Sequence, residues 1–384
     1  MPGHAQDVLQ EWIQPGCTIA IADGVGSPTS LYADLSIVAA ATPNTRLILG
    51  WLPELPTTLN LTAFADVRAF MPGRALSRQV ADGIVKYVPA YISQLPALFA
   101  GVWRPDVLIM AVRETQHGLN LATEASWIKV AAHTAGVCLA ELNNALPAAA
   151  RSAMLEDVDV SVIAESNHPP FEVPTKAPDD AITQIGVELA SLVSPGSTVQ
   201  FGPGPIANAL VAALQSPVSV DSGIITDAVV DLDARGLLAD DPRATYLAGT
   251  ETLYKWADGR TILDGVEITH DPARLSSLDL VAVNTALQID LIGQVALEGT
   301  PRLPATGIGG HTDYAYAASR STNGLSIIAL PSRRGGQSTL VERLSVPVAT
   351  PRSVIDVVVT EHGHADLRGL TDVERANAIS RLFP

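Results

Sequence analysis

The sequence predicts an α/β protein with mainly parallel sheets. Short apolar runs of the kind found in buried strands alternate with segments whose apolar residues have helical spacing. Strands that alternate with helices indicate βαβ units. The same alternation starts again after a proline-rich stretch near the middle of the chain. A length of 384 residues is too great for one ordinary domain and suggests two or three.

The first half of the chain contains four predicted strands and two predicted helices. The strands cover 16–23, 45–52, 107–112 and 137–142, and the helices cover 29–41 and 92–99. The stretch 167–180, NHPPFEVPTKAPDD, has four prolines and little periodicity, as expected of a domain boundary. We therefore expect one domain over residues 1–174 and a second over 175–384.

The second half repeats the arrangement of the first. We predict helices at 181–192 and 206–214 and strands at 195–202 and 354–360, with a last helix opened by the capping box of Thr371 and Glu374. The runs PGCTI at 15–19 and PGSTV at 195–199 each lead through a strand into a G-x-G turn followed by proline, and then into a helix. This recurrence favours a duplicated α/β unit. The alternative is chance, because PG-x-T is common before strands.

Charge and composition restrict the possible partners. The formal charge of −16 argues against nucleic acid and anionic membranes, but a small anion could still be held by local arginines. Cys17 and Cys138 fit no metal or redox spacing, and we expect both to be buried. The N-terminus lacks signal-peptide features, and no apolar run reaches the roughly 18 residues of a membrane span. We expect a soluble cytoplasmic protein.

Two G-x-G turns follow predicted strands, one at Gly24 and Gly26 and the other at Gly202 and Gly204. Neither continues to the third glycine of a dinucleotide-binding motif, and neither is followed by a P-loop lysine, so NAD and ATP fit poorly. Their N–H groups could receive a carbonyl oxygen or an oxyanion. Alternatively, each is a tight turn that needs glycine for a positive φ.

The stretch 278–328 contains most of the remaining candidate chemistry. Two strand-like runs meet at Asn284-Thr285, and in the second run Gln288 and Asp290 share one face, opposite three apolar side chains. These two polar residues face either solvent or a cleft. Further on, the glycine-rich turn 307–310 has bare backbone that can approach a ligand closely, and His311 and Asp313 follow it.

Neither a metal site nor a serine nucleophile is indicated. The histidines are scattered without the spacing of metal ligands, and no G-x-S-x-G motif occurs. Several arginines lie in the last quarter of this acidic chain, among them Arg320, Arg333, Arg334, Arg343 and Arg352. Such guanidinium groups near a glycine-rich turn suggest a phosphate-bearing ligand. The alternative is an ordinary solvated face.

Four runs resemble the acetyl-CoA hydrolase/transferase family of class I coenzyme A transferases: AVNTALQIDLIGQV, GIGGHTDYAYAA, LSIIALPS and VIDVVVTEHGHADLRGLTDVERANAI. The resemblance implies two similar CoA-transferase-type α/β domains, the active site between them and a homodimer. It implies acyl-CoA and a small carboxylate as substrates, with no tightly bound cofactor. It also implies a ping-pong mechanism in which a glutamate attacks the thioester.

The resemblance places that glutamate in a motif that here reads Asn284-Thr285-Ala286-Leu287-Gln288-Ile289-Asp290, so Gln288 occupies the position of the nucleophile. A second departure is Gly223, where relatives often carry a glutamate. By resemblance, the catalytic candidates are Gln288, His311 and Asp313. The substrate and oxyanion candidates are Gly24, Gly26, Gly202, Gly204 and Asp290, and the CoA-binding candidates are Gly307, Ile308, Gly309, Gly310, Arg333 and Arg334.

An amide is a very poor nucleophile, so three hypotheses follow from Gln288. The first is hydrolysis, with water oriented by Gln288 or activated by Asp290, His311 or Asp313. The second is CoA transfer by another carboxylate, for which Glu298 is a weak candidate because a turn at Gly293-Gln294 separates it from Gln288. The third is a catalytically inactive protein that binds CoA or acyl-CoA as a sensor or partner subunit.

Overall fold

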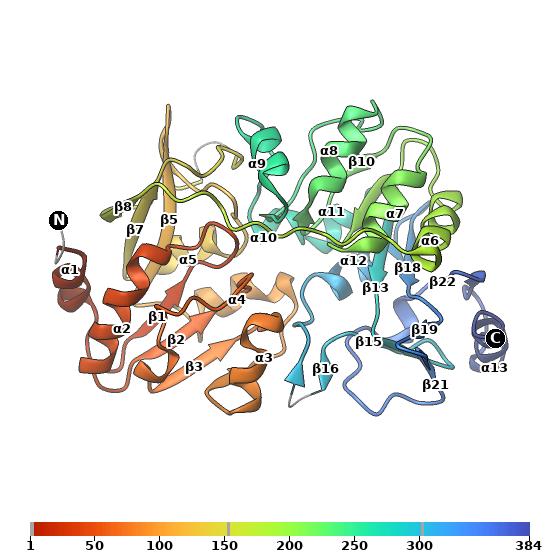
Figure 1. Ribbon diagram of the computed structural model, residues 1–384, viewed down its shortest axis with the longest axis horizontal. Helices are drawn as coiled ribbons and strands as arrows, with labels where there is room; N and C mark the ends of the chain where they lie inside the picture. Colours follow the sequence, from red (N-terminus) through yellow and green to blue (C-terminus); the bar gives the residue numbers. More distant parts are fainter. Residues whose placement is uncertain (1–3, 152–153, 301–302) are drawn as a thin grey trace.

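The protein consists of two lobes lying side by side, each built on an open sheet flanked by helices (Figure 1). The computed structural model describes residues 4–151, 154–300 and 303–384. Helix α1 (His4–Trp12) lies at the outer end of the first lobe and helix α13 (Asp372–Ser380) at the outer end of the second (Figure 1). The predicted fold class, α/β with mainly parallel sheets, is confirmed.

The first lobe is organised around a sheet with strand order β4-β3-β2-β1-β5-β7-β8. Every neighbouring pair along this path is parallel, and β6 pairs antiparallel with β5. The strands are β1 (Thr18–Ile21), β2 (Arg46–Leu49), β3 (Asp66–Ala69), β4 (Val85–Tyr87), β5 (Val107–Thr115), β6 (Gly118–Asn120), β7 (Val137–Asn143) and β8 (Val160–Ser166). The helices are α2 (Tyr32–Ala41), α3 (Gly73–Ala81), α4 (Leu95–Ala100) and α5 (Ile128–Thr134), with 3-10 turns η1 (Thr29–Leu31), η2 (Leu61–Ala63) and η3 (Ile92–Gln94).

All four strands predicted in the first lobe are present, although β1 and β2 are shorter than expected. Gly16 has φ 83, which a strand does not accommodate, so β1 begins only at Thr18. Strands β3, β4, β6 and β8 were not predicted. Their burial is alternating or partial, and β3 and β4 are also very short, which leaves little apolar signal in the sequence.

The second lobe has a sheet of order β10-β9-β13-β18-β22-β23, parallel except for β23 at its edge. Its strands are β9 (Thr198–Phe201), β10 (Ser219–Val220), β13 (Leu280–Thr285), β18 (Leu325–Ala329), β22 (Val357–Thr360) and β23 (Gly363–Asp366). The helices α6 (Asp180–Ser191) and α7 (Pro205–Ala213) cover one face, and α11 (Pro272–Ser276) and α12 (His311–Ala318) cover the other. On β13, Val281 and Val283 face the first layer, whereas Leu280 and Ala282 face the second.

Shorter elements surround this sheet. They are β11 (Ile224–Ile225), β12 (Tyr246–Leu247), β14 (Gln288–Asp290), β15 (Val295–Ala296), β16 (Gly299–Thr300), β17 (Leu303–Pro304), β19 (Arg333–Arg334), β20 (Gln337–Ser338), β21 (Leu340–Val341), α8 (Asp227–Ala234), α9 (Glu251–Ala257), α10 (Val266–Thr269) and η4 (Arg352–Val354). Strand β14 pairs with β15 and β21 in a separate small sheet beyond the end of β13. This small sheet therefore positions Gln288.

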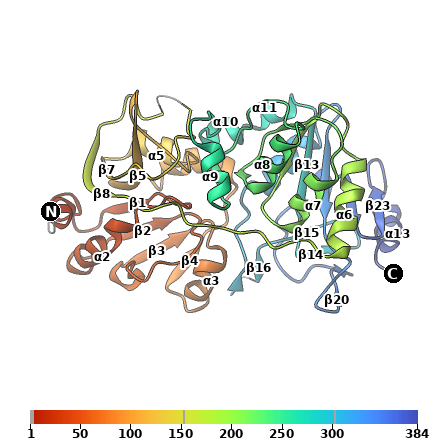
Figure 2. The same ribbon diagram turned by 45° about the horizontal axis from the view of Figure 1, so that its top comes forward.

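The proline-rich segment 167–179 runs in extended form from β8 to α6 across both lobes (Figure 2). Phe171 donates its N–H to Val25 of the first lobe at 2.9 Å, and Val173 donates to Gly249 of the second at 2.7 Å. The segment is thus hydrogen-bonded to both lobes. Both cysteines are buried, as predicted. Within the described residues, no helix is long and apolar enough to cross a membrane.

Candidate active site

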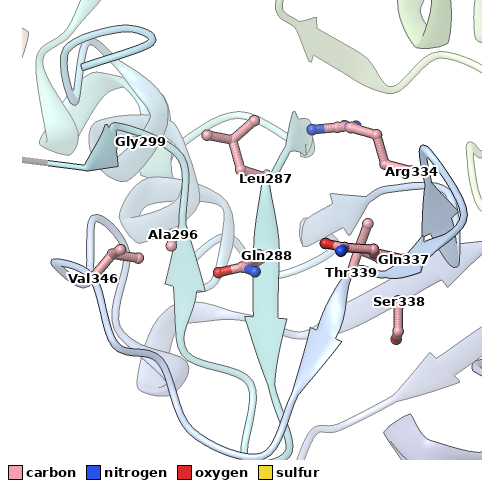
Figure 3. Close-up of a pocket in the computed structure, with 9 residues that line it drawn as sticks. All are labelled: Leu287, Gln288, Ala296, Gly299, Arg334, Gln337, Ser338, Thr339 and Val346. Carbon is pink, nitrogen blue, oxygen red and sulfur yellow. The ribbon is translucent and has the colours of Figure 1, made fainter. Parts of the chain in front are cut away.

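Gln288, the first residue of β14, projects into a pocket of about 340 Å³ in the second lobe. Its amide lies between Ala296 and Val346 on one side and Gln337 and Thr339 on the other (Figure 3). The remaining lining residues are Leu287, Gly299, Arg334 and Ser338. Leu287 thus lines the same pocket as Gln288 and not an opposite face, because the regular strand begins only at Gln288.

No carboxylate and no imidazole is among the nine residues found to line this pocket in the described parts of the chain. Asp290 is buried, and its Oδ1 accepts the N–H groups of Ile292 at 3.2 Å and Gln294 at 2.8 Å. These bonds close the turn at Gly293, whose φ is 93. Asp290 therefore shapes the turn after β14, and the pocket around Gln288 is neutral apart from Arg334.

The structure separates the two neighbouring arginines. Arg334 lines the pocket, and its Nη2 lies 3.5 Å from the carbonyl oxygen of Ala286. Arg333 is outside the lining and donates to the carbonyl oxygen of Gly336 at 2.9 Å within its own hairpin. Only Arg334 is thus placed to meet an anionic group of a ligand bound beside Gln288.

The glycine-rich turn 307–310 packs between the two lobes. A Cβ on Gly307 would lie 2.4 Å from the carbonyl oxygen of Phe70, and one on Gly310 would lie 2.4 Å from His270 Nε2. Gly309 has φ 62, and its carbonyl oxygen accepts the N–H of Ile92 at 3.2 Å. Ile308, between Gly307 and Gly309, is half-buried. These close contacts explain the glycines without a ligand, and the role of the turn in binding CoA remains a prediction.

His311 begins α12 and uses both ring nitrogens within the protein. Nε2 lies 3.2 Å from the carbonyl oxygen of Thr285, which can only accept, so Nε2 carries the proton. Nδ1 lies 2.7 Å from the hydroxyl of Thr350 and accepts from it. Burial lowers the pKa of His311 to about 4, so the ring is neutral near pH 7.

Asp313 and Glu298 connect the second lobe to the first. Asp313 accepts the N–H of Ser93 at 3.0 Å and its hydroxyl at 2.6 Å, and burial raises the pKa of Asp313 to about 6. Glu298 accepts the hydroxyl of Tyr87 at 2.5 Å. Neither carboxylate lines the Gln288 pocket. Both therefore hold the lobes together in this structure.

The two G-x-G turns are occupied differently. At the end of β9, nothing described lies within 4 Å of where a Cβ on Gly202 or Gly204 would be, so this turn is open. At the end of β1, the N–H of Gly26 donates to Glu124 Oε1 at 3.1 Å, and the carboxyl of Glu124 packs against Gly24. In the first turn, the space that an oxyanion could use is filled by a side chain of the protein.

Glu124 and its neighbour Asp23 are buried carboxyls that the sequence did not reveal as candidates. Asp23 lies two residues after β1 and precedes the G-x-G turn, a position at the carboxyl end of a parallel strand where ligands commonly bind. That position was a signal available in the sequence. Glu124 lies 98 residues from Gly26, and only the tertiary fold brings them together.

Gly223, the second departure noted in the sequence, lies beside His270 and Tyr314 of the second lobe. A Cβ at this position would be 3.5 Å from His270 Nε2 and 3.9 Å from Tyr314, an ordinary contact distance. Burial lowers the pKa of His270 to about 3, which keeps the imidazole neutral. A larger side chain at position 223 would therefore meet a neutral, buried environment. In the described residues, no group of three or more potential metal ligands occurs.

Comparison with protein families places this geometry among known proteins. Residues 249–382 match the acetyl-CoA hydrolase/transferase C-terminal domain. The chain is 30% identical over 331 residues to the 4-hydroxybutyrate coenzyme A transferase of Clostridium kluyveri, covering 81% of this chain and 77% of that protein. It is 30% identical over 200 residues to the acetyl-CoA hydrolase of Saccharomyces cerevisiae, covering 47% of this chain and 36% of the other.

Solved structures agree with this assignment at the level of the fold. RipA from Yersinia pestis superposes with a TM-score of 0.87 at 24% identity, covering 98% of this chain and 93% of RipA. The 4-hydroxybutyrate CoA-transferase from Porphyromonas gingivalis superposes with a TM-score of 0.76 at 23% identity, covering 98% of this chain and 92% of the other. With this sequence identity and coverage, the chain belongs to the acetyl-CoA hydrolase/transferase family.

Proposed function

We propose that this protein acts on acyl-CoA thioesters and that it favours hydrolysis, or another modified mechanism, over ping-pong CoA transfer. The observation that carries the proposal is the neutral amide of Gln288 in a pocket where no carboxylate is among the lining residues that the structure describes. An ionised carboxylate can attack a thioester and carry CoA, whereas an amide cannot do so effectively. Gln288 can instead donate a hydrogen bond to a carbonyl oxygen or orient a water molecule.

The binding of CoA is assigned to groups around this pocket. Arg334 lines the pocket and supplies positive charge for a phosphate. The resemblance adds Arg333 as a second positive charge and the turn 307–310 as a source of backbone N–H donors. The open turn at Gly202 and Gly204 has space for a thioester oxygen near bare backbone. Relatives are described as transferases that act with acetate, succinate and 4-hydroxybutyrate groups, so a small carboxylate is the proposed second substrate if transfer occurs.

A second candidate is a catalytically inactive homologue that binds CoA or acyl-CoA as a sensor or partner subunit. This alternative is favoured by the hydrogen bonds of the three residues proposed to activate water. Asp290, His311 and Asp313 are each hydrogen-bonded to other groups of the protein. Under this alternative the pocket still holds CoA, but none of these three groups activates water.

Two measurements separate the candidates. Incubation with acetyl-, propionyl-, succinyl- and 4-hydroxybutyryl-CoA is followed by release of free thiol. Release well above the rate in buffer supports an enzyme, and no release with any of them contradicts the hydrolase. Mass spectrometry of the incubated protein then tests for a CoA adduct. An adduct on a carboxylate supports transfer, and its absence together with tight CoA binding supports the binding protein.

Three features of the assembly are also proposed. We assign residues 1–174 and 175–384 to two CoA-transferase-like domains, because the extended segment 167–179 leads out of the first sheet and into α6. We retain a homodimer and a cytoplasmic location as predictions. Size-exclusion chromatography with light scattering tests the first of these, and cell fractionation tests the second.

A further inference from the structure

The β19–β20 hairpin, residues 333–338, forms part of the pocket around Gln288 but is itself exposed. Arg334, Gln337 and Ser338 of this hairpin line the pocket, as does the adjoining Thr339. The side chains at 333–338 are all exposed, and the hairpin is only two strands wide. A two-stranded hairpin on its own is marginally stable in water. The position of these lining residues therefore depends on what holds the base of the hairpin.

Ser332 and Thr339 form the base of the hairpin, and both are buried. The N–H of Thr339 donates to the carbonyl oxygen of Ser332 at 3.0 Å. The hydroxyl of Thr339 donates to the carbonyl oxygen of Pro331 at 2.7 Å. These bonds join the two arms of the hairpin to each other, so a further contact must hold the base against the rest of the lobe.

Glu361 makes that contact. Its Oε2 accepts the N–H of Ser332 at 2.8 Å, and its Oε1 accepts the hydroxyl of the same serine at 2.5 Å. Hydrogen bonds to a carboxylate are stronger than those between neutral groups. Glu361 directly follows Thr360, the last residue of β22, and this strand is buried throughout. The carboxylate thus bonds the base of an exposed hairpin to the end of a buried strand in the main sheet.

The base of the hairpin also holds the strand that carries Gln288. The carbonyl oxygen of Thr339 accepts the N–H of Ile289 at 3.0 Å, where β14 pairs with β21. Ile289 directly follows Gln288, and Thr339 lies beside the Gln288 amide in Figure 3. Hydrogen bonds therefore connect Glu361, through Ser332 and Thr339, to the residue next to Gln288. Two walls of the pocket depend on the same base.

Glu141 of the first lobe forms a similar pair with a serine, but away from the pocket. It accepts the N–H of Ser30 at 3.0 Å and the hydroxyl of Ser30 at 2.6 Å. Neither of these two residues is among the described residues that line the pocket. Glu361 does not line the pocket either, so any effect of Glu361 on a ligand must pass through the hairpin. The Glu141 pair therefore provides a matched comparison for the Glu361 pair.

We propose that Glu361 is a positioning residue for acyl-CoA binding: through Ser332 it holds the β19–β20 hairpin where the lining residues can meet the ligand. The inference rests on the proposed function, in which the Gln288 pocket binds the thioester. If only a fraction of the molecules have the hairpin in place, the apparent Kd rises by the inverse of that fraction. Loss of the carboxylate thus weakens binding without removing a group that touches the ligand.

The test measures the Kd for CoA by isothermal titration in two variants of Glu361. In Glu361→Ala, the hydroxyl of Ser332 keeps only its longer contact with His362 Nε2 at 3.3 Å. We expect the Kd to rise about tenfold, as it does when about one tenth of the molecules are competent to bind. In Glu361→Gln, the amide can accept from the N–H of Ser332 and donate to its hydroxyl, so the Kd should stay within about threefold.

Two further variants separate positioning from general loss of stability. Glu141→Ala removes the matched carboxylate, so it should lower the melting temperature but leave the Kd for CoA within about threefold of the wild type. Ser332→Ala removes the hydroxyl and keeps the N–H, so the Kd should rise about threefold, a partial loss of the same contact. Ser332→Ala is the milder change and tests the proposal if Glu361→Ala does not fold.

Turnover provides a second readout with any acyl-CoA that the wild type hydrolyses. In Glu361→Ala, KM should rise with the Kd, while kcat at saturating substrate should stay within about threefold of the wild type. A variant that combines Glu361→Ala with Arg334→Gln should bind CoA only about tenfold more weakly than the wild type, because both changes act on one contact. A loss of about 100-fold would show that the two residues act independently and would contradict the proposal.

Other outcomes also overturn the proposal. A wild-type Kd in Glu361→Ala removes the positioning role and leaves the proposed function intact. Tighter binding in both Glu361→Ala and Glu361→Gln shows that the charge of Glu361 acts on CoA directly. A loss of affinity in Glu141→Ala equal to that in Glu361→Ala shows general destabilisation. A wild-type chain that neither binds CoA nor releases thiol from any acyl-CoA overturns the proposed function, and this inference with it.

Discussion

Asp313 of the second lobe accepts both the backbone N–H and the hydroxyl of Ser93 in the first, at 3.0 and 2.6 Å. The first turn of α12 is thereby joined to η3 across the interface. The same helix begins with His311, whose ring is bonded to Thr285 and Thr350. Two residues proposed as catalytic from the sequence thus fix α12 in place, and this relationship can be tested through stability.

The Asp313→Asn variant should alter the pH dependence of folding. Burial raises the pKa of Asp313 to about 6, above its ordinary value of 3.8, so the folded state holds this proton more tightly than the unfolded state. The stabilisation from protonated Asp313 is therefore complete below pH 3.8 and is lost as the pH rises through 6. We expect the unfolding free energy of the wild type, relative to Asp313→Asn, to fall by about 2.4 kcal/mol from pH 4 to pH 7.

Urea unfolding at several pH values measures this difference, and Asp372→Asn is a control. Asp372 is an exposed residue at the start of α13, and its ion pair within the described residues is with Arg352 at the surface. A difference between wild type and Asp313→Asn that stays constant from pH 4 to pH 7 would contradict the buried ionisation of Asp313.

Restoring a carboxylate in the pocket should create or greatly raise transferase activity. In Gln288→Glu the new side chain has almost the same shape, lies in the same pocket and can attack a thioester. We expect exchange of labelled acetate into acetyl-CoA and a CoA adduct on residue 288 in the variant. Gln337→Glu adds a carboxylate to the same pocket at another position and is the matched control. If Gln288→Glu transfers no CoA, the site has diverged beyond this one residue.

The sequence predicted the fold wherever the local signal was strong. The apolar run TIAI predicted β1, which is buried throughout. The capping box predicted the start of α13: the side chain of Thr371 accepts the N–H of Glu374, and the side chain of Glu374 accepts the N–H of Thr371 at 2.8 Å. Burial in a parallel sheet and helix capping depend on neighbours in the chain, so both leave a local pattern. Strands β3 and β4 are short and only alternately or partly buried, so they left little apolar signal in the sequence and were missed.

The candidate site was predicted less completely, because its contacts are tertiary. The sequence placed Gln288 and Arg334 in a functional region, and the structure brings both to one pocket. The sequence offered no reason to connect Glu124 with Gly26, because only the fold of the first lobe brings these two residues together. Likewise, the glycines at 307–310 led us to expect a ligand beside this turn. The structure instead places the backbone of Phe70 against Gly307.

That contact leads to a prediction about Gly307. A methyl group at this position would lie 2.4 Å from the carbonyl oxygen of Phe70 and 3.0 Å from the Cα of Met71. Backbone atoms cannot move aside cheaply, so Gly307→Ala should destabilise the ligand-free protein by about 1–3 kcal/mol. Gly202→Ala is the control, since nothing described lies within 4 Å of a Cβ there. Equal melting temperatures for the two variants would contradict the close packing of the lobes at Gly307.

The adjacent arginines of the β19–β20 hairpin provide a last test, of where CoA binds. Both arginines are exposed, but Arg334 lines the pocket beside Gln288, whereas Arg333 lies outside the lining and donates a hydrogen bond to Gly336 within the hairpin. Each substitution to Gln removes the same charge, so long-range electrostatic effects are matched, and a difference between them reports direct contact with the ligand. We expect Arg334→Gln to raise the Kd for CoA about tenfold, the loss of roughly 1.4 kcal/mol. Arg333→Gln should change the Kd by less than about threefold, a value typical of exposed charges. Isothermal titration with CoA, and with dephospho-CoA to detect a contact with the 3′-phosphate, measures both. If the two variants weaken binding equally, CoA is attracted by the general charge of the hairpin, and the pocket at Gln288 is not its binding site.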